Sequence, residues 1–307
     1  MSNPLGVLLG KLALSSPLIL SSGILGLSAS SLKRVAAQGA GAVTTKSCGL
    51  NERPGHPCPS VIPFEHGLLN AVGLSNPGVA EMIREIQDFR TKSSAPIIAS
   101  VFGANIEEFG MVTEIIAEAK PDLIEVNISC PNVESEFGLP FGSDPVACAR
   151  ITKLVKKKAG KIPVSMKLTA NCPSIAHMAK VCQDNGADLI TAINSVGPGM
   201  LIDLNVRKPV LANKTGGVSG PCILPVAVRC VWEIFRAVKV PIIGGGGVSN
   251  TDSALQMILA GATAVGIGTG VYPKGLSVFN EINNGIREFM RTKKIRKLSS
   301  LIGGAHV

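Results

Sequence analysis

Residues 241–270 read PIIGGGGVSNTDSALQMILAGATAVGIGTG, and this stretch contains the repeating unit on which the fold prediction depends. Pro241–Gly244 and Ala264–Ile267 are short apolar runs typical of buried strands. Between them a helix is predicted over Asn250–Ala260, because it begins with a typical cap residue and is followed by Gly261. A strand, a helix and a second strand in succession are the unit of a parallel sheet.

The same unit repeats along the whole chain. Eight strands are predicted: Leu18–Ser21, Ala42–Thr45, Pro96–Ser100, Leu123–Asn127, Val164–Leu168, Leu189–Ile193, Pro241–Gly244 and Ala264–Ile267. The helix-like segments are Ser30–Gln38, Val79–Arg90, Ile106–Ala119, Asp144–Ala159, Ser174–Asn185, Ile223–Val238, Asn250–Ala260 and Leu276–Arg291. This continuous rhythm predicts an α/β fold, a closed TIM (β/α)8 barrel with long loops at its C-terminal face. No linker divides the chain, so residues 1–307 are expected to form one domain.

The composition limits the class of protein. Of 307 residues, 46% are hydrophobic and 17% are charged, which excludes a disordered chain. The longest apolar runs are broken by Gly, Pro, Ser or a charge before the roughly 18 residues that a membrane span needs. No basic segment precedes the first apolar stretch as in a signal peptide, so a cytoplasmic location without membrane contact is expected.

Charge and cysteine spacing exclude two further kinds of partner. The net charge is +9, but the basic residues cluster only at Lys156–Lys158 and Arg287–Lys297, and one Trp and one Tyr give them no stacking platform. No nucleic acid partner is therefore expected. The eight cysteines form no CxxC pair and have no His at zinc-finger spacing, which predicts free thiols and no metal site.

The residues that end the strands of a barrel meet at the face where active sites lie. Two of them are lysines, Lys46 in TTKS and Lys167 in SMKL. Because an unpaired ammonium is costly to bury after an apolar strand, each is expected to meet an anion or a polar ligand. Three long connections, Ser47–Gly78, Ile128–Ser143 and Ser195–Cys222, follow strand ends and are expected at the same face.

Glycine runs follow the last two strands, at Gly244–Gly247 and in GIGTG at 266–270. Loops after the seventh and eighth strands commonly bind phosphate in this fold, because glycine lets backbone amides approach a ligand closely. The spacing does not match the GxGxxG fingerprint of dinucleotide-binding folds. The two runs predict a bound phosphorylated cofactor or substrate.

The segment EVNISCPN at residues 125–132 places Cys130 just past the fourth predicted strand. A lone cysteine is ordinarily a buried core residue, but this position favours chemistry. The histidines offer no evident Cys–His pair, so a protease-like nucleophile is disfavoured. A proton acceptor is favoured instead, with a nearby lysine stabilising the thiolate.

Four asparagines accompany these residues: Asn70, Asn127, Asn132 and Asn194. Carboxamides both donate and accept hydrogen bonds, so several that converge suit a flat ring with cyclic amide edges, and Lys46 would meet the carboxylate of such a ligand. Loop capping explains Asn70 and Asn132 equally well.

Together these residues resemble the class 1 dihydroorotate dehydrogenases, the FMN enzymes of pyrimidine synthesis. The resemblance covers essentially the whole chain. It is carried by SSG (21–23), TTKS (44–47), LLNAVGLSNPG (68–78), VNISCPN (126–132), FGSDP (141–145), MKL (166–168), INS (193–195), TGGVSGP (215–221), the glycine run 244–247 and GTG (268–270). The membrane-bound class 2 enzymes differ, because they have Ser as base and an N-terminal helical extension.

The resemblance implies roles for individual residues. Cys130 would be the catalytic base. The substrate contacts would be Lys46, Asn70, Ala71, Val72, Gly73, Leu74, Asn127, Asn132, Asn194 and Ser195. The flavin contacts would be Ser22, Lys46, Ser47, Ser100, Asn127, Lys167, Ile193, Gly220, Gly246, Gly247, Gly268 and Thr269. The chain departs from the family pattern at Ser100, which is commonly Asn, at Ser195, which is more often Thr, and at Val196–Met200.

The implied reaction is the oxidation of (S)-dihydroorotate to orotate. Cys130 would remove a proton from C5 while hydride leaves C6 for N5 of FMN. Lys167 would stabilise charge at the N1/C2 carbonyl edge of the flavin. The loop Pro131–Ser143 would close over the substrate and exclude water.

Two other functions remain open at this point. One is an FMN barrel like the flavin domain of dihydropyrimidine dehydrogenase, which has a similar NxSCP segment but is larger and carries iron–sulfur domains. The other is a noncatalytic barrel that binds a phosphorylated ligand and needs neither Cys130 nor Lys167.

The family pattern also implies partners. The segment with Phe137, Leu139, Pro140 and Phe141 resembles the NAD-using class 1B more than the fumarate-using class 1A. A homodimer that docks a second subunit holding FAD and a [2Fe–2S] cluster is therefore expected.

Overall fold

The structure, a computed structural model, describes residues 3–129 and 141–306, and its centre is a closed barrel of eight parallel strands. In chain order the strands are β3 (Leu18–Leu20), β4 (Ala42–Thr44), β7 (Ile97–Val101), β8 (Leu123–Asn127), β9 (Val164–Leu168), β10 (Leu189–Ala192), β15 (Ile242–Gly245) and β16 (Ala264–Ile267). The last strand pairs with the first, at Gly266 and Ile19, which closes the barrel. The predicted α/β TIM barrel is confirmed.

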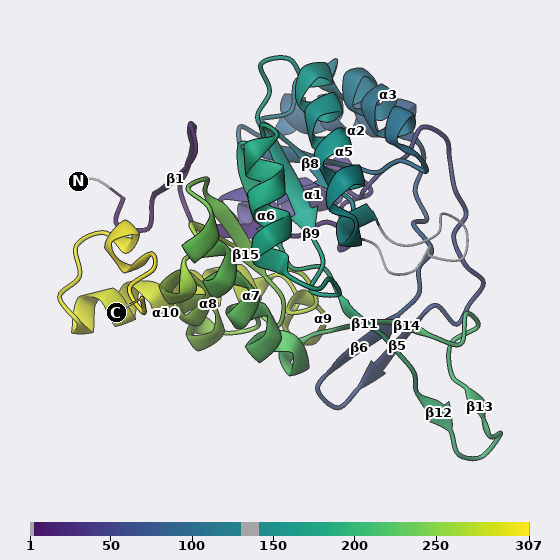
Figure 1. Cartoon of the computed structure of the whole chain (residues 1–307). Helices are drawn as coiled ribbons and strands as arrows, with labels where there is room; N and C mark the ends of the chain where they lie inside the picture. Colours follow the sequence, from purple (N-terminus) through teal and green to yellow (C-terminus); the bar gives the residue numbers. More distant parts are fainter. Residues whose placement is uncertain (1–2, 130–140, 307) are drawn as a thin grey trace.

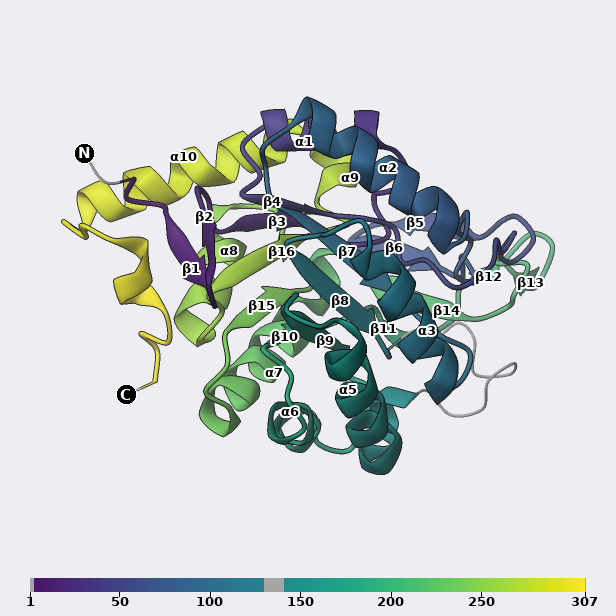
Figure 2. The same ribbon diagram turned by 90° about the horizontal axis from the view of Figure 1, so that it is seen from above.

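Helices cover the outside of the barrel, as Figure 2 shows. They are α1 (Ala29–Ala37), α2 (Val79–Lys92), α3 (Ile106–Ala117), α5 (Pro145–Lys158), α6 (Ile175–Asp184), α7 (Leu224–Ala237), α8 (Thr251–Ala260) and α10 (Ser277–Thr292). Their starts follow the sequence signals: the side chains of Asp144 and Asn250 accept backbone N–H groups of α5 and α8, respectively. The short helix α9 (Val271–Lys274) and the 3-10 turns η2 (Phe141–Ser143), η3 (Pro221–Ile223) and η4 (Leu298–Leu301) were not predicted.

The barrel strands are buried on both faces, which explains their continuous apolar character. The exceptions are polar side chains that are almost fully inaccessible. They are Thr44, Ser100, Glu125, Asn127, Ser165, Lys167 and Thr191. Because side chains alternate along a strand, Glu125 and Asn127 share one face of β8, as Ser165 and Lys167 share one face of β9.

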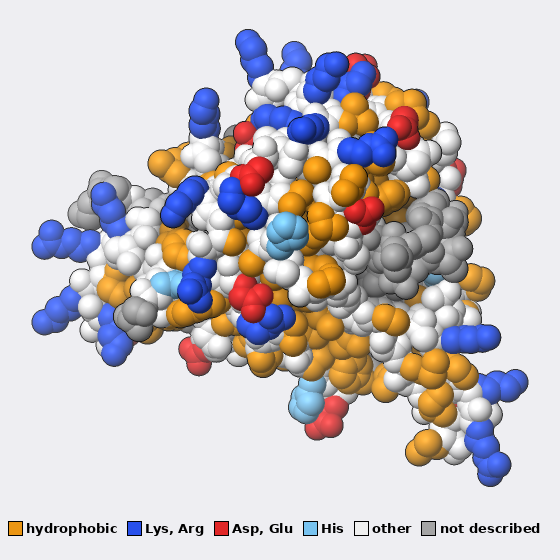
Figure 3. Space-filling model, viewed as in Figure 1, with side chains coloured by type: hydrophobic (Ala, Val, Ile, Leu, Met, Phe, Trp, Pro, Cys, Tyr) orange, Lys and Arg blue, Asp and Glu red, His pale blue; other side chains and the backbone are white. Residues whose placement is uncertain are grey.

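A four-stranded antiparallel sheet is built from two of the long connections. Its strands are β5 (Val61–Phe64), β6 (Gly67–Asn70), β11 (Val196–Gly199) and β14 (Gly216–Ser219), in the order β11-β14-β6-β5. The connection after β10 also forms the hairpin β12 (Ile202–Asp203) and β13 (Lys208–Pro209), which extends away from the barrel in Figure 1. Apolar side chains gather on this hairpin in Figure 3, with Leu204 85% exposed.

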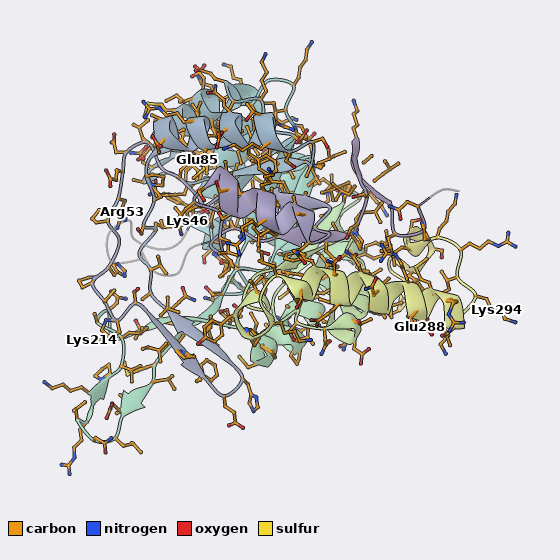
Figure 4. All side chains as sticks on the ribbon, turned by 180° about the vertical axis from the view of Figure 1, so that it is seen from behind. Lys46, Arg53, Glu85, Lys214, Glu288 and Lys294 are labelled. Carbon is orange, nitrogen blue, oxygen red and sulfur yellow. The ribbon has the colours of Figure 1, made fainter. Side chains whose placement is uncertain are left out.

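The two chain ends lie on the opposite side of the molecule from this hairpin (Figure 1). There β1 (Val7–Leu9) pairs with β2 (Leu12–Leu14), and Leu298 N donates to Pro4 O. Figure 4 shows that basic residues are spread between these two sides, with Lys214 near the hairpin and Lys294 beyond α10. In the described part of the chain, no helix is long and apolar enough to cross a membrane.

Candidate active site

A cavity opens at the C-terminal ends of the barrel strands, where the polar strand residues and the long connections meet. Most of the predicted site residues line it: Ser22, Lys46, Ser47, Asn70, Val72, Gly73, Leu74, Asn127, Lys167, Ile193, Asn194, Ser195, Gly220, Gly246, Gly247, Gly268 and Thr269. Ala71 and Ser100 are fully buried and do not line the cavity. Cys130 and Asn132 lie outside the described residues.

Lys167 and Glu125 form a buried ion pair in the cavity wall. The Lys167 Nζ is 3.2 Å from Glu125 Oε1, and the two residues are only 6% and 3% exposed. The same ammonium donates to Ser22 Oγ at 2.6 Å. The polar partner that the sequence required for Lys167 is therefore supplied in part by the chain itself.

Glu125 also ends a directed chain of hydrogen bonds. Ser100 Oγ donates to Glu125 Oε1 at 3.1 Å and lies 2.8 Å from Ser47 Oγ. Because the Ser100 proton is used toward Glu125, the proton between the two hydroxyls must come from Ser47. Asn127 Nδ2 in turn donates to Ser47 Oγ at 3.2 Å. The carboxylate therefore orients three predicted contact residues at once.

A second set of hydrogen bonds extends from Asn127 toward β10. Asn127 Oδ1 accepts the Ser129 hydroxyl at 3.0 Å, and Asn194 Nδ2 donates to Ser129 Oγ and to the Ser129 carbonyl oxygen, both at 3.2 Å. These bonds fix both amide planes. They also fix the backbone at Ser129, the residue that precedes Cys130.

No role was predicted for Glu125, although its position in the sequence indicates one. A carboxylate stands in the run LIEV, whose other residues are apolar, two residues before Asn127. A charge at an inward position of a fully buried strand requires a partner. The spacing could have predicted a pair with one of the two strand-end lysines, but not which one.

Within the described ranges, no cysteine lines the cavity, and the seven described cysteines are free thiols. Cys48 follows the predicted contact Ser47 directly. Burial raises the pKa of its thiol to about 12, so Cys48 stays protonated at neutral pH. The same ranges contain no cluster of three or more His, Cys, Asp or Glu residues that could hold a metal ion.

Comparison with known proteins assigns the chain to a family. The sequence model for dihydroorotate dehydrogenase matches residues 5–290. The chain belongs to the dihydroorotate dehydrogenase family. The predicted family is thus confirmed, and the chain is an enzyme of this type.

Among curated relatives, the proteins of Methanosarcina mazei and Methanocella arvoryzae are each 43% identical to this chain. The first alignment covers 96% of this chain and 93% of the relative, and the second covers 97% and 96%. A protein of Methanocaldococcus jannaschii is also 43% identical, over 95% of this chain and 94% of its own length. All three are named dihydroorotate dehydrogenase B (NAD(+)), catalytic subunit.

Dihydroorotate dehydrogenases are in general flavin-dependent, and the glycine-rich side of the cavity in this family member leaves room for a ligand. A Cβ atom added to Gly268 would meet only Ser21 and Ile24, at 3.7 and 4.0 Å, so the space beside it is open to a ligand. Gly247 also lines the cavity and has φ +78°; a Cβ added there would come within 2.7 Å of Leu224, so this close approach of the backbone requires glycine. Thr269 adds a hydroxyl, which donates to Ser219 Oγ at 2.8 Å.

Apart from the buried Ala71, the segment from Asn70 to Leu74 lines another side of the cavity. It is held by residues for which no role was predicted. Arg53 Nε donates to Gly73 O at 2.8 Å, and His56 Nδ1 lies 3.2 Å from Ala71 O. Gly73 has φ +69°, and a Cβ there would come within 2.7 Å of the His56 ring and backbone. Only glycine fits this position, so the His56 ring fixes the course of the segment.

Proposed function

We propose that this chain oxidises (S)-dihydroorotate to orotate as the FMN-containing catalytic subunit of an NAD-linked dihydroorotate dehydrogenase. The observation that carries the proposal is the composition of one cavity wall in a member of this family. Lys46, Asn127 and Asn194 line the same space as the Lys167–Glu125 pair and the glycine runs. A noncatalytic phosphate-binding barrel would require the glycines but not this set of amides and charges.

The substrate has a carboxylate and a ring with cyclic amide edges. Lys46, which lines the cavity two residues after β4, would bind the carboxylate. Asn70, Asn127 and Asn194 would bind the amide edges, together with Ala71, Val72, Gly73, Leu74, Asn132 and Ser195. Asn70 Nδ2 donates to Gly217 O at 3.0 Å, so the antiparallel sheet fixes the plane of this amide before any ligand binds.

Cys130 is the proposed catalytic base, which takes the proton from C5 of the substrate. Two observations support it: the described part of the cavity wall contains no thiol, and Cys130 directly follows the hydrogen-bonded Ser129 in the sequence. A thiolate near a lysine is a competent proton acceptor.

FMN would be held by the glycine-rich side and by the lysines. Its phosphate would be surrounded by Gly220, Gly246, Gly247, Gly268 and Thr269. The rest of the cofactor would be contacted or supported by Ser22, Lys46, Ser47, Ser100, Asn127, Lys167 and Ile193. When bound, FMN would accept the hydride from C6 of dihydroorotate. Lys167 would stabilise the negative charge that the cofactor gains.

The proposed partners rest on the names of the relatives and on the family resemblance, not on any described surface. Because those proteins are named catalytic subunits of an NAD(+) enzyme, we propose that this chain works with a second subunit. The family resemblance implies that this subunit holds FAD and a [2Fe–2S] cluster and that it docks on a cytoplasmic homodimer of this chain. The test is anaerobic mixing of the purified chain with dihydroorotate and then with NAD. Dihydroorotate should bleach the flavin, and NAD should not restore its colour until the second subunit is added. Recolouring by fumarate alone would place the chain in class 1A.

Replacing Gly268 by alanine should weaken FMN binding without weakening the fold. The added methyl makes only ordinary contacts with the protein, so the free energy of unfolding of the flavin-free chain should change by less than about 0.5 kcal/mol. In the complex the methyl would clash with the cofactor at a cost of roughly 1–3 kcal/mol, which raises the FMN dissociation constant by about 5- to 150-fold. Flavin fluorescence titration measures this constant.

The matched variant is Gly247→Ala, where a Cβ would lie 2.7 Å from Leu224 N and φ is +78°. That change should destabilise the flavin-free chain itself. Wild-type FMN affinity in Gly268→Ala would show that no cofactor lies against Gly268.

A further inference from the structure

The Lys167–Glu125 pair raises a question that the proposed function does not answer. A lysine that serves only to stabilise negative charge on a cofactor would act most strongly alone. Here its ammonium lies 3.2 Å from the carboxylate of Glu125, a residue that is only 3% exposed. Both side chains line the cavity, so the carboxylate acts on the same space as the ammonium.

The charge balance of the cavity depends on Glu125. Among the described residues, the charged side chains in its wall are Lys46, Lys167 and Glu125. Two cations and one anion leave a single net positive charge, which would double if Glu125 were neutral. Little solvent reaches this pair to screen it, so the change would act at nearly full strength on a molecule in the cavity.

We propose that Glu125 is a positioning residue that holds the Lys167 ammonium at the cavity wall and offsets part of its charge, and so sets the reduction potential of the bound flavin. This inference rests on the proposed function, because it requires FMN in the cavity. Charge near the flavin ring is one of the means by which a protein tunes this cofactor. With Glu125 present, the reduced and more negative form is favoured less than Lys167 alone would favour it.

The substitution Glu125→Gln removes the negative charge of this side chain but keeps its shape. The amide oxygen of glutamine can accept the hydrogen bonds that Glu125 Oε1 accepts from Ser100 and Lys167, at 3.1 and 3.2 Å. Both neighbours can therefore keep their positions while the negative charge is lost. Glu125→Gln should strengthen binding of reduced FMN over oxidised FMN by about tenfold, which raises the two-electron midpoint potential by about 30 mV.

The experiment is a spectroscopic redox titration of the FMN-loaded protein against a reference dye, for the wild type and three variants of the pair. Glu125→Gln should raise the potential and Lys167→Met should lower it. The double variant should lie between them. If Glu125 had only a structural role, its loss would make the protein less stable but leave the flavin potential unchanged. Oxidised and reduced FMN would then lose affinity by the same factor.

Asp122→Asn is the matched control. Asp122 lies directly before β8, at the opposite end of the strand from Asn127, and does not line the cavity. Its Oδ2 is also paired, with Arg90 Nη2 at 2.7 Å and Ile97 N at 2.8 Å. Its loss should leave the potential unchanged.

An unchanged or lowered potential in Glu125→Gln would overturn the inference. If Glu125→Gln does not retain flavin, Lys167→Met is compared with the double variant instead. The double variant should have the higher potential, and equal potentials in the two proteins would refute the proposed role of Glu125. A wild-type chain that takes up no FMN would instead overturn the proposed function, and the inference with it.

Discussion

Replacing Cys130 by alanine is expected to slow reduction of the bound flavin by dihydroorotate by roughly 10²–10⁴-fold, the usual contribution of a positioned base. FMN and orotate affinities should remain near those of the wild type, because the base is not a principal binding group. Stopped-flow absorbance after anaerobic mixing measures the rate. In the unmodified chain this rate should rise with pH, since the thiolate is the basic form.

Cys222→Ala is the control for this experiment. Cys222 is exposed and does not line the cavity, so its loss should leave the rate unchanged. A wild-type rate of single-turnover reduction in Cys130→Ala would remove Cys130 from the mechanism. An equal slowing in both variants would point to a general effect of thiol loss rather than to a base.

Lys167→Met is expected to cost about 3–5 kcal/mol in the free energy of unfolding of the flavin-free chain. The reason is that the change leaves Glu125 as a buried carboxylate without its cation. Urea unfolding followed by circular dichroism measures the loss. Adding Glu125→Gln to the same protein should recover most of it, because no uncompensated charge then remains.

Lys156→Met provides the comparison at an exposed ion pair. Lys156 Nζ lies 2.5 Å from Asp188 Oδ2, but these side chains are 32% and 37% exposed. Solvent screens this pair, so its loss should cost no more than about 1 kcal/mol. If the two methionine variants were equally stable, burial of the Lys167–Glu125 pair would have no energetic consequence.

The barrel could be predicted because its signals are local. Each strand is a short apolar run, and the helices begin at caps such as Asn250 and Asp144, which act within a few residues. The strand-end lysines were found for the same reason. A charge immediately after an apolar strand is visible in the sequence, and in a parallel barrel all such ends meet at one face.

The features that were missed depend on residues far apart in the chain. In the antiparallel sheet, β6 pairs with β14, so Asn70 meets Gly217, and no local pattern specifies this register. Likewise the hydrogen bond from Ser100 to Glu125 joins the neighbouring strands β7 and β8, and His56 reaches the Asn70–Leu74 segment from a separate loop. Pairing of this kind is set by packing and not by spacing along the sequence.

The most direct test of the central claim is to purify the chain with its cofactor and add one equivalent of dihydroorotate without oxygen. The proposed function predicts a yellow protein whose flavin absorbance is lost as an equal amount of orotate appears. Reoxidation in the presence of NAD should then require the second subunit. A protein that binds no flavin, or a bound flavin that dihydroorotate leaves oxidised, would contradict the assignment of this cavity as the site of dihydroorotate oxidation.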